Sequence, residues 1–292
     1  MIAEADRLPV LSSTKHRDYI LTPYEPPVPA LGGLHPASLL KHLMRYEGLD
    51  AWPVVEALRA HLGPDETVWG AKWGPSGFAV EFYFYNFVDN AAGNPAAATA
   101  LAQALGGVLR FDHPVDERLP YFMCSFEVSR ALLEAQRGSD FRVYLRSGDK
   151  HRRECGFSYR CAARGELVLE NHYWFYFAKK EPELEDAVRR VQASPRSGAR
   201  GCWAQLLPKQ LRDCFTICYA VKPHWDGLYY SRVSAAQLLP FLRAHGRDHV
   251  AEVLAAHERD FAHALWDLGF DFAAPPGAQG LRIEKLALHG VV

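Results

Sequence analysis

The sequence predicts an α+β protein in which ten antiparallel strands close into one barrel. Five segments each read as two strands joined by a turn, and several of these strands alternate apolar residues with aromatic or charged ones. Successive side chains of a strand point to opposite faces, so such a strand has one apolar face and one polar, aromatic face. Helical segments separate most of the pairs, which predicts repeated helix-helix-strand-strand units with the helices outside.

Composition indicates a globular chain. The 292 residues are 49% hydrophobic and 23% charged, with a formal net charge of −1. A net charge this small gives no sign of a nucleic-acid-binding surface. No apolar run approaches the length of a membrane span. The first residues lack the charged, apolar and cleavage regions of a signal peptide. The six cysteines show no C-x-x-C spacing, which favours reduced thiols. We therefore expect a cytoplasmic protein with no nucleic-acid or membrane partner.

Proline and glycine divide the chain into an arm and a domain. Residues 1–34 contain five prolines and the pair Gly32-Gly33, which predicts an extended N-terminal arm. Residues 35–292 form the predicted single barrel domain. Its first two elements are helices at 36–48 and 51–62, where apolar residues recur at helical spacing.

The first strand pair, residues 67–87, shows the alternation most clearly. Its second strand places phenylalanine and valine on one face and Glu81, Tyr83 and Tyr85 on the other. Lys72 on its first strand adds a cation if it points the same way. A helix beginning at Asn94-Pro95 follows.

The second and third strand pairs repeat the pattern. The second occupies 122–128 and 141–146, with a short helix between its strands. The third occupies 155–161 and 166–177, and a helix at 182–192 follows. Simple alternation predicts that their polar faces carry Arg142, Tyr144, Arg146, Arg160, Glu170, His172, Trp174 and Tyr176.

The fourth pair occupies 215–222 and 227–233 and carries Lys222 and Tyr229. Ser234 caps the next helix, and a longer helix is predicted from 248 to 268. A fifth pair, FDFAA and LRIEKLAL, ends the sequence, and either Arg282 or Lys285 can point with its polar set.

The combined polar faces suggest a ligand chemistry. Burying several positive charges together costs free energy unless an anion binds to them, and a diphosphate is a suitable anion. Aromatic faces stabilise a desolvated cation by about 2 kcal/mol per good contact. An allylic diphosphate combines both needs, because its head is anionic and its departing group becomes a carbocation.

These features resemble the ABBA-type prenyltransferases of the PT-barrel fold. The resemblance rests on the order of helices and strand pairs and on a V-x-[LF]-Y-[FY]-like strand followed by an alanine-rich helix, as in AVEFYFY and DGLYYSRV, and it covers residues 36 to 292. It implies transfer of a prenyl group from an allylic diphosphate to an aromatic small molecule, an amino acid or a peptide. The chain has no Asp-Asp-x-x-Asp motif, which fits that family. No cofactor is required, and Mg²⁺ is compatible with the chemistry although no motif implies it.

The resemblance also assigns roles. Glu81 would take the proton of the acceptor, with Glu170 as second choice and His172 as an alternative acid or base. The diphosphate would be bound by Lys72, Arg142, Arg146, Arg160, Lys222 and Lys285. The allylic cation would be shielded by Tyr83, Tyr85, Tyr144, Trp174, Tyr176 and Tyr229.

Other interpretations stay open. Cations and aromatic residues also occur on ordinary half-exposed sheets, because tyrosine, phenylalanine and tryptophan favour strands. A metal-dependent enzyme of repeated β-α modules would use Glu170, His172 and another histidine as ligands. A non-catalytic barrel would bind an apolar ligand or a partner in natural-product biosynthesis. The sequence contains no His-Glu-x-x-His, G-x-S-x-G, P-loop or GxGxxG motif. It does not predict the acceptor, the prenyl length or the oligomeric state.

Overall fold

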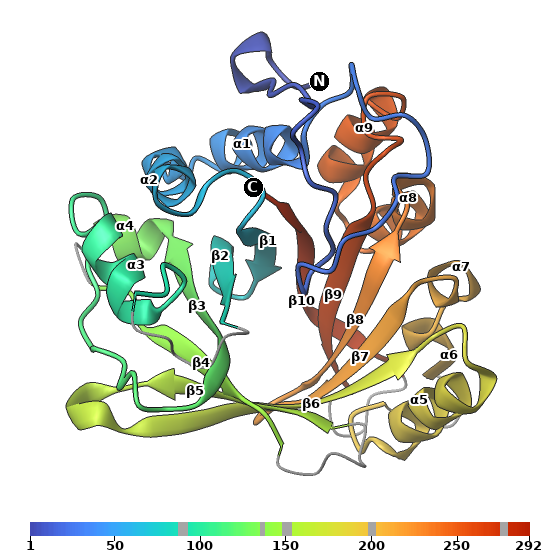
Figure 1. Ribbon diagram of the computed structural model, residues 1–292. Coiled ribbons are helices and arrows are strands. Elements are labelled where there is room, and N and C mark those ends of the chain that lie inside the picture. Colours follow the sequence, from blue (N-terminus) through green and yellow to red (C-terminus); the bar gives the residue numbers. More distant parts are fainter. Residues whose placement is uncertain (87–92, 135–137, 148–153, 198–202, 275–279) are drawn as a thin grey trace.

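Ten strands form a closed antiparallel barrel in the computed structural model, which describes residues 1–86, 93–134, 138–147, 154–197, 203–274 and 280–292 (Figure 1). Each strand pairs with its neighbour in the sequence, and the last strand pairs with the first. The five predicted strand pairs are all present. The strands are β1 (Val68–Gly74), β2 (Gly77–Tyr85), β3 (Tyr121–Ser129), β4 (Phe141–Leu145), β5 (Glu154–Cys161), β6 (Leu167–Phe177), β7 (Thr216–Val221), β8 (Asp226–Val233), β9 (Trp266–Ala273) and β10 (Arg282–Val291).

Pairing of β1 with β10 closes the barrel. Val68 lies opposite Val291 in this register. Just beyond the strands, the backbone amide of Val292 donates to the carbonyl of Thr67 at 2.8 Å, and the amide of Thr67 donates back at 3.3 Å. Closure leaves no strand edge unpaired, which removes the usual route to edge-to-edge aggregation.

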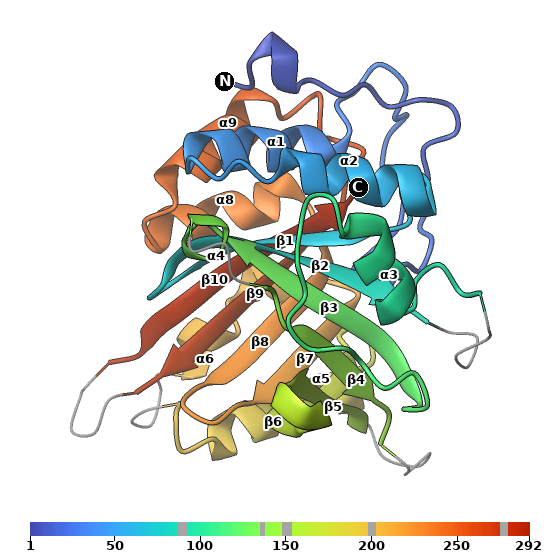
Figure 2. The same ribbon diagram turned by 90° about the vertical axis from the view of Figure 1, so that its left-hand side faces the viewer.

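The longer helices lie beside the strands (Figures 1 and 2). Helix α1 (Pro36–Tyr46) contacts β1 and β10, and α5 (Glu181–Ala193) contacts β6 and β7. Helix α2 (Trp52–Leu62) packs on α3 (Ala98–Leu105), and α8 (Ala235–Ala244) packs on α9 (Asp248–Ala256). The short helices are α4 (Arg130–Glu134), α6 (Trp203–Leu206) and α7 (Lys209–Arg212). The spacing of helices and strand pairs is not uniform, since the described residues between β2 and β3 contain one helix, α3. Among the described residues, no helix has the length and apolar character to cross a membrane.

Two separate apolar clusters show that the strands are two-faced. The larger one joins strand residues such as Phe82, Phe126 and Phe270 to helix residues such as Leu40 and Leu242. The smaller one lies inside the barrel, and its buried members are Val68, Tyr83, Tyr85, Met123, Tyr144 and Val291. The alternation predicted for β2 and β4 is therefore confirmed.

The long helix predicted for 248–268 is wrong. Helix α9 is much shorter, and β9 occupies residues 266–273. Leu268 and Phe270 belong to the larger apolar cluster, while Asp267 and Asp271 alternate with them. This period of two is the signature of a strand, so β9 begins at Trp266, four residues before the predicted strand FDFAA.

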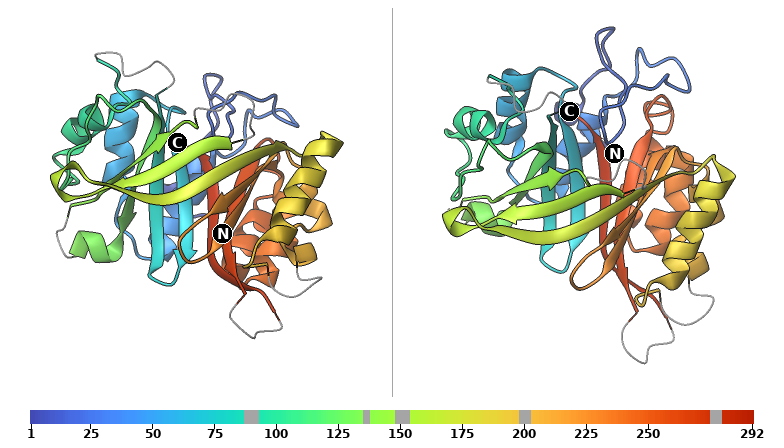
Figure 3. Two further views of the ribbon diagram at one scale, coloured as in Figure 1. Left: turned by 90° about the horizontal axis from the view of Figure 1, so that it is seen from below. Right: turned by 60° about the horizontal axis from the view of Figure 1, so that its bottom comes forward.

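A β-bulge in β6 overturns part of the predicted alternation. Ser158 of β5 pairs with Asn171, but the next residue, Tyr159, pairs with Leu169, which leaves Glu170 as an extra residue. One extra residue reverses the face of every later side chain. Figure 3 shows β6 crossing from the β3–β4 side of the barrel to the β7–β8 side, so the reversal affects a long stretch of wall.

The N-terminal arm folds back across one end of the barrel (Figure 1, dark blue). After a short 3-10 helix (Glu4–Asp6), it forms a tight turn at 18–22, where Leu21 has a left-handed φ of 57°. Asp18 accepts hydrogen bonds from the amides of Ile20 and Thr22 and pairs with Arg232 of β8, which lies at an irregularity in the pairing of β8 with β9. The arm is therefore fixed to the barrel wall.

Candidate functional site

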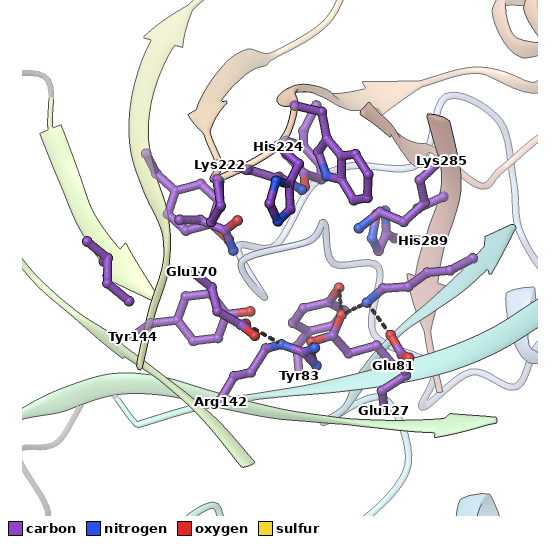
Figure 4. A pocket seen from close by; sticks show the side chains of 18 of the residues that line it. Glu81, Tyr83, Glu127, Arg142, Tyr144, Glu170, Lys222, His224, Lys285 and His289 are labelled. Carbon is purple, nitrogen blue, oxygen red and sulfur yellow. Dashed lines mark hydrogen bonds and ion pairs between the residues drawn. The ribbon is translucent and has the colours of Figure 1, made fainter. Parts of the chain in front are cut away.

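The barrel encloses a cavity of about 360 Å³, a size typical of small-molecule sites. Side chains from β1, β2, β3, β4, β6, β8 and β10 line it, together with the turn 223–225 and one residue of the arm, Tyr19. Figure 4 shows the view into this cavity, with Arg142 facing Glu170 on one side and Lys285 beside His289 on the other.

The inward residues form three levels, which we define by their chemistry. Their order is that of the inward positions along β2, which recur every second residue. On β2 they are Glu81, then Tyr83, then Tyr85. We call the first level the charged end; it contains Lys72, Glu81, Glu127, Arg142, Glu170, Lys222, Asp271 and Lys285. The second, the tyrosine belt, contains Tyr83, Tyr144, Tyr173 and Tyr229. The third, the arm end, contains Val68, Tyr85, Met123 and Val291, beside the arm.

Lys72 joins two carboxylates at the charged end. Glu81 and Glu127 are direct neighbours across β2 and β3. The Lys72 ammonium contacts the Glu81 carboxylate and lies 2.9 Å from Glu127 Oε2. Burial alone would raise the pKa of Glu127, but the charge of Lys72 outweighs it and lowers the pKa. Both carboxylates are therefore ionised at neutral pH, and this group of three carries one net negative charge.

Glu81 has further partners. The Tyr83 hydroxyl donates to Glu81 Oε2 at 2.7 Å, and Ser125 Oγ donates to Oε1 at 2.5 Å. Arg142 Nη1 lies 3.5 Å from the same Oε1. Burial would raise the pKa of Glu81, but Lys72 and Arg142 together hold it well below its ordinary value. In this arrangement the carboxylate is a weak base, and it becomes a stronger one only when Lys72 moves away.

Glu170 of β6 links two arginines, Arg142 of β4 and Arg160 of β5. Arg142 Nε donates to Glu170 Oε2 at 2.7 Å, while Arg160 Nε lies 3.5 Å from Oε1. Arg160 also lies 3.5 Å from Asp140 Oδ2 and stands at the rim rather than in the cavity. This part of the charged end is electrically balanced.

Lys222 and Lys285 share a single buried carboxylate. Their ammonium groups lie 2.6 Å and 3.0 Å from the two oxygens of Asp271, and Lys222 also donates to the Tyr229 hydroxyl at 2.9 Å. Burial would raise the pKa of Asp271, but the two lysines lower it. This cluster carries one net positive charge. The charged end is thus polarised, positive beside β9 and β10 and negative beside β2 and β3.

Internal pairing corrects the electrostatic argument made from the sequence. That argument required an external anion for the inward cations. In the structure Lys72, Arg142, Arg160, Lys222 and Lys285 each have a carboxylate of the chain itself as a partner. A buried cation needs such a partner because desolvation is otherwise too costly.

Glycines allow the aromatic rings of the belt to lie against the wall. A Cβ at Gly269 would lie 2.5 Å from Tyr229 Cδ1, and one at Gly70 would lie 2.6 Å from His289 Cδ2. Both separations are shorter than real Cβ atoms tolerate. Burial raises the pKa of Tyr83 and of Tyr229, so both hydroxyls stay protonated. Burial also lowers the pKa of His289 to about 4, so this imidazole is neutral at pH 7.

Four of the predicted site residues lie away from both the cavity and its rim. Arg146 is exposed beyond the opposite end of β4, with its guanidinium 5.6 Å from the Phe122 ring. The bulge at Glu170 turns His172, Trp174 and Tyr176 to the outer face. The ring of His172 lies tilted against that of Trp174 there, with 3.8 Å between the ring centroids, and Arg190 of α5 lies over Trp174 and donates to the Tyr176 hydroxyl.

The other predicted residues lie within the barrel or at its rim. Lys72, Glu81, Tyr83, Arg142, Tyr144, Glu170, Lys222, Tyr229 and Lys285 line the cavity. Tyr85 lies deeper, at the arm end, where its hydroxyl donates to the carbonyl of Tyr19. The ambiguity in the last strand is resolved, because Lys285 points inward whereas Arg282 is exposed and pairs with Glu284.

Sequence reasoning missed several cavity residues. Glu127 follows Met123 and Ser125 at a period of two, so simple alternation could have found it. Asp271 alternates in the same way within β9. Tyr173 needed the bulge, and Tyr19 needed the path of the arm, neither of which has a local sequence signal.

No protein-family model matches the chain, and no curated protein matches it. Within the part of the chain that the structure describes, no group of three or more His, Cys, Asp or Glu side chains is placed to hold a metal ion. Glu170 and His172 lie on opposite faces of β6, so they do not form the ligand pair of the metal-dependent alternative.

Proposed function

We propose that the protein is a prenyltransferase of the PT-barrel type, built from helix-and-strand-pair units with helices outside, which moves an isoprenyl group from an allylic diphosphate to an aromatic or peptide acceptor. The observation that carries the proposal is the order of levels in one closed lumen. Charge, aromatic π faces and apolar side chains follow one another along the axis, and an allylic diphosphate has its anionic head, its reacting carbon and its hydrocarbon tail in the same order.

The positive side of the charged end is the proposed diphosphate site. Lys222 and Lys285 share Asp271, so together they have one charge left for an incoming anion. Arg142 and Arg160 stand on the facing wall and can rotate from Glu170 toward the same anion. Charge-assisted hydrogen bonds of this kind are about twice as strong as neutral ones. They stabilise the leaving diphosphate most when its negative charge is fully developed.

The tyrosine belt is the proposed site of the allylic cation. When the carbon–oxygen bond of the donor breaks, its electron pair leaves with the diphosphate and a carbocation remains. Tyr83, Tyr144, Tyr173 and Tyr229 surround that position. A desolvated cation gains about 2 kcal/mol from each good aromatic face, and exclusion of water prevents its loss to hydrolysis.

The negative side of the charged end is the proposed proton acceptor. The acceptor molecule supplies the electron pair of the new bond to carbon and must lose a proton. Glu81, Glu127 and Lys72 carry one net negative charge, so uptake of one proton makes the group neutral. If Lys72 turns toward the bound diphosphate, the pKa of Glu81 rises because its strongest opposing charge is withdrawn.

Product formation tests the proposal directly. The purified protein is incubated with dimethylallyl or geranyl diphosphate and with tryptophan, tyrosine or short peptides, and the products are identified by mass spectrometry. We expect a prenylated acceptor and released diphosphate. The double variant Lys222→Met/Lys285→Met should abolish turnover, while Lys179→Met, an exposed lysine outside the barrel, should leave it unchanged.

A second function, a non-catalytic barrel that binds an apolar ligand, is favoured by one observation. Every cation of the charged end already has an internal carboxylate partner, so an empty lumen is electrostatically satisfied. Absence of product together with absence of thermal stabilisation by either diphosphate would favour the carrier and overturn the prenyltransferase.

A further inference from the structure

The arm end of the lumen is closed by a residue from outside the barrel. Tyr19, in the tight turn of the N-terminal arm, lines the cavity. Its ring lies 5.1 Å from the ring of Tyr83, 5.0 Å from that of His289 and 6.5 Å from that of Tyr85. The next inward residue of the arm, Leu21, packs against the same interior cluster. The arm therefore places the side chains of Tyr19 and Leu21 inside the barrel and not against the outer surface of the strands.

The position of Tyr19 is fixed from several sides. The Tyr85 hydroxyl donates to the carbonyl oxygen of Tyr19. Asp18, immediately before it, accepts two amides of the turn and receives Arg232 Nε at 2.8 Å. Directly before Asp18 in the sequence, Arg17 Nη1 lies 2.6 Å from Glu66 Oε2. Because these contacts hold Tyr19 in place, its ring sets the depth of the lumen and does not simply fill space.

The surroundings of Tyr19 have the chemistry of a hydrocarbon site. On the far side from the charges, the interior cluster consists of Val68, Met123, Val291 and the ring of Tyr85. Two buried ionisable side chains lie beside Tyr19: Asp267, which accepts from the backbone of Tyr19 and lies near the Asp18–Arg232 pair, and the neutral His289. A tail that extends from the tyrosine belt toward the arm would thus meet the ring of Tyr19 first and the apolar groups beyond it.

From this geometry we infer that Tyr19 limits the length of the isoprenyl tail that the lumen accepts. This inference rests on the proposed function, since it identifies which allylic diphosphate the site takes. The head is held at the charged end, the first isoprene unit lies in the tyrosine belt, and Tyr19 stands where a further unit would extend. Removing its ring extends the cavity toward the apolar side chains of Val68, Met123 and Val291.

Three variants at one position test the inference. Tyr19→Ala removes the ring, Tyr19→Phe keeps the ring without its hydroxyl, and Tyr19→Trp enlarges it. Tyr46→Ala is the matched control, because Tyr46 is an exposed tyrosine on α1, outside the lumen. Circular dichroism verifies that each variant is folded. Binding of dimethylallyl, geranyl and farnesyl thiolodiphosphates, which do not react, is then measured by calorimetry, and turnover is measured with the corresponding diphosphates.

We expect Tyr19→Ala to shift the ratio of geranyl to dimethylallyl affinity toward geranyl by about tenfold to a hundredfold, the range of discrimination by apolar pockets. Tyr19→Phe and Tyr46→Ala should keep the wild-type ratio, and Tyr19→Trp should shift it the other way. If the wild type binds the analogues but the ratio is the same in Tyr19→Ala and Tyr19→Trp, the inference about Tyr19 is overturned. If the wild type binds no analogue, the proposed function itself fails, and the two failures are thereby distinguished.

Discussion

Replacement of Lys72 by methionine removes the only lysine that contacts both Glu81 and Glu127 in the described part of the chain. The side chains of Lys72 and Glu81 are 9% and 3% exposed, so their contact is buried, whereas Glu127 is 36% exposed and is partly screened. Breaking a buried ion pair by removing one partner costs about 3–5 kcal/mol. Because Arg142 still lies 3.5 Å from Glu81, we expect the lower end, about 3 kcal/mol at pH 7.

This loss should appear as a lower melting temperature. For a chain of this size, about 3 kcal/mol corresponds to a decrease of roughly 5 °C. Thermal and urea unfolding, followed by circular dichroism, measure the two quantities independently. The control is Lys179→Met, which removes an exposed lysine and should change the free energy of unfolding by less than about 0.5 kcal/mol.

The pH dependence of the same variant tests the cause. In the wild type the pKa of Glu81 and that of Glu127 are lowered, so their contribution to stability is present above the unfolded value of about 4.3 and is lost as pH falls through the folded values. Without Lys72, burial raises the pKa of Glu81, and the folded state binds the proton more tightly than the unfolded state. The difference in stability between variant and wild type should therefore shrink between pH 7 and pH 5. A loss below about 1 kcal/mol at pH 7, or a difference that stays constant with pH, would refute the reasoning.

Three other substitutions have defined outcomes. Gly269→Ala places a Cβ 2.5 Å from Tyr229 Cδ1, so urea unfolding should show a loss of about 1–3 kcal/mol, whereas Gly280→Ala, with open space at its Cβ, should show much less. Asp267→Asn keeps a neutral hydrogen-bond acceptor at this position. Burial and Asp18 raise the pKa of Asp267, so the wild type loses stability as pH rises through that pKa. In thermal melts the stability of the variant relative to the wild type should therefore be greater at pH 8 than at pH 5. Asp18→Asn weakens the contact with Arg232, so limited proteolysis should cut residues 1–34 faster than in the wild type while the barrel stays intact; equal cutting rates would contradict the role assigned to Asp18.

The strands could be predicted because their two faces differ chemically. Phe82 and Phe84 alternate with Tyr83 and Tyr85, and a period of two is a local property that needs no knowledge of the fold. The same rule correctly placed Arg142, Tyr144 and Tyr229 in the lumen. It also indicated that the strands would close, since an isolated sheet would expose a face unsuited to either water or a core.

The errors came from events that are not periodic. The bulge at Glu170 changed the face of everything after it, which moved Trp174 outward and Tyr173 inward. The helical reading of 248–268 concealed the first residues of β9, Asp267 among them, because an apolar run of that length fits either period for several residues. The internal pairing of the cations depends on which carboxylates lie across a strand boundary, as Glu127 does beside Glu81, and registers between strands are not encoded locally.

The meeting of β1 with β10 has a consequence for how the barrel is assembled. Nine of the ten strand contacts join neighbours in the sequence and can form one after another, as hairpins add to a growing sheet. The tenth joins segments from opposite ends of the domain, and the cost of closing a loop rises only slowly with its length. Until that last contact forms, the sheet is an open, curved ribbon with two free edges, and its charged and tyrosine-lined face is accessible to water. The lumen therefore exists only once β1 and β10 have met, and its polar lining stays hydrated for as long as the sheet is open.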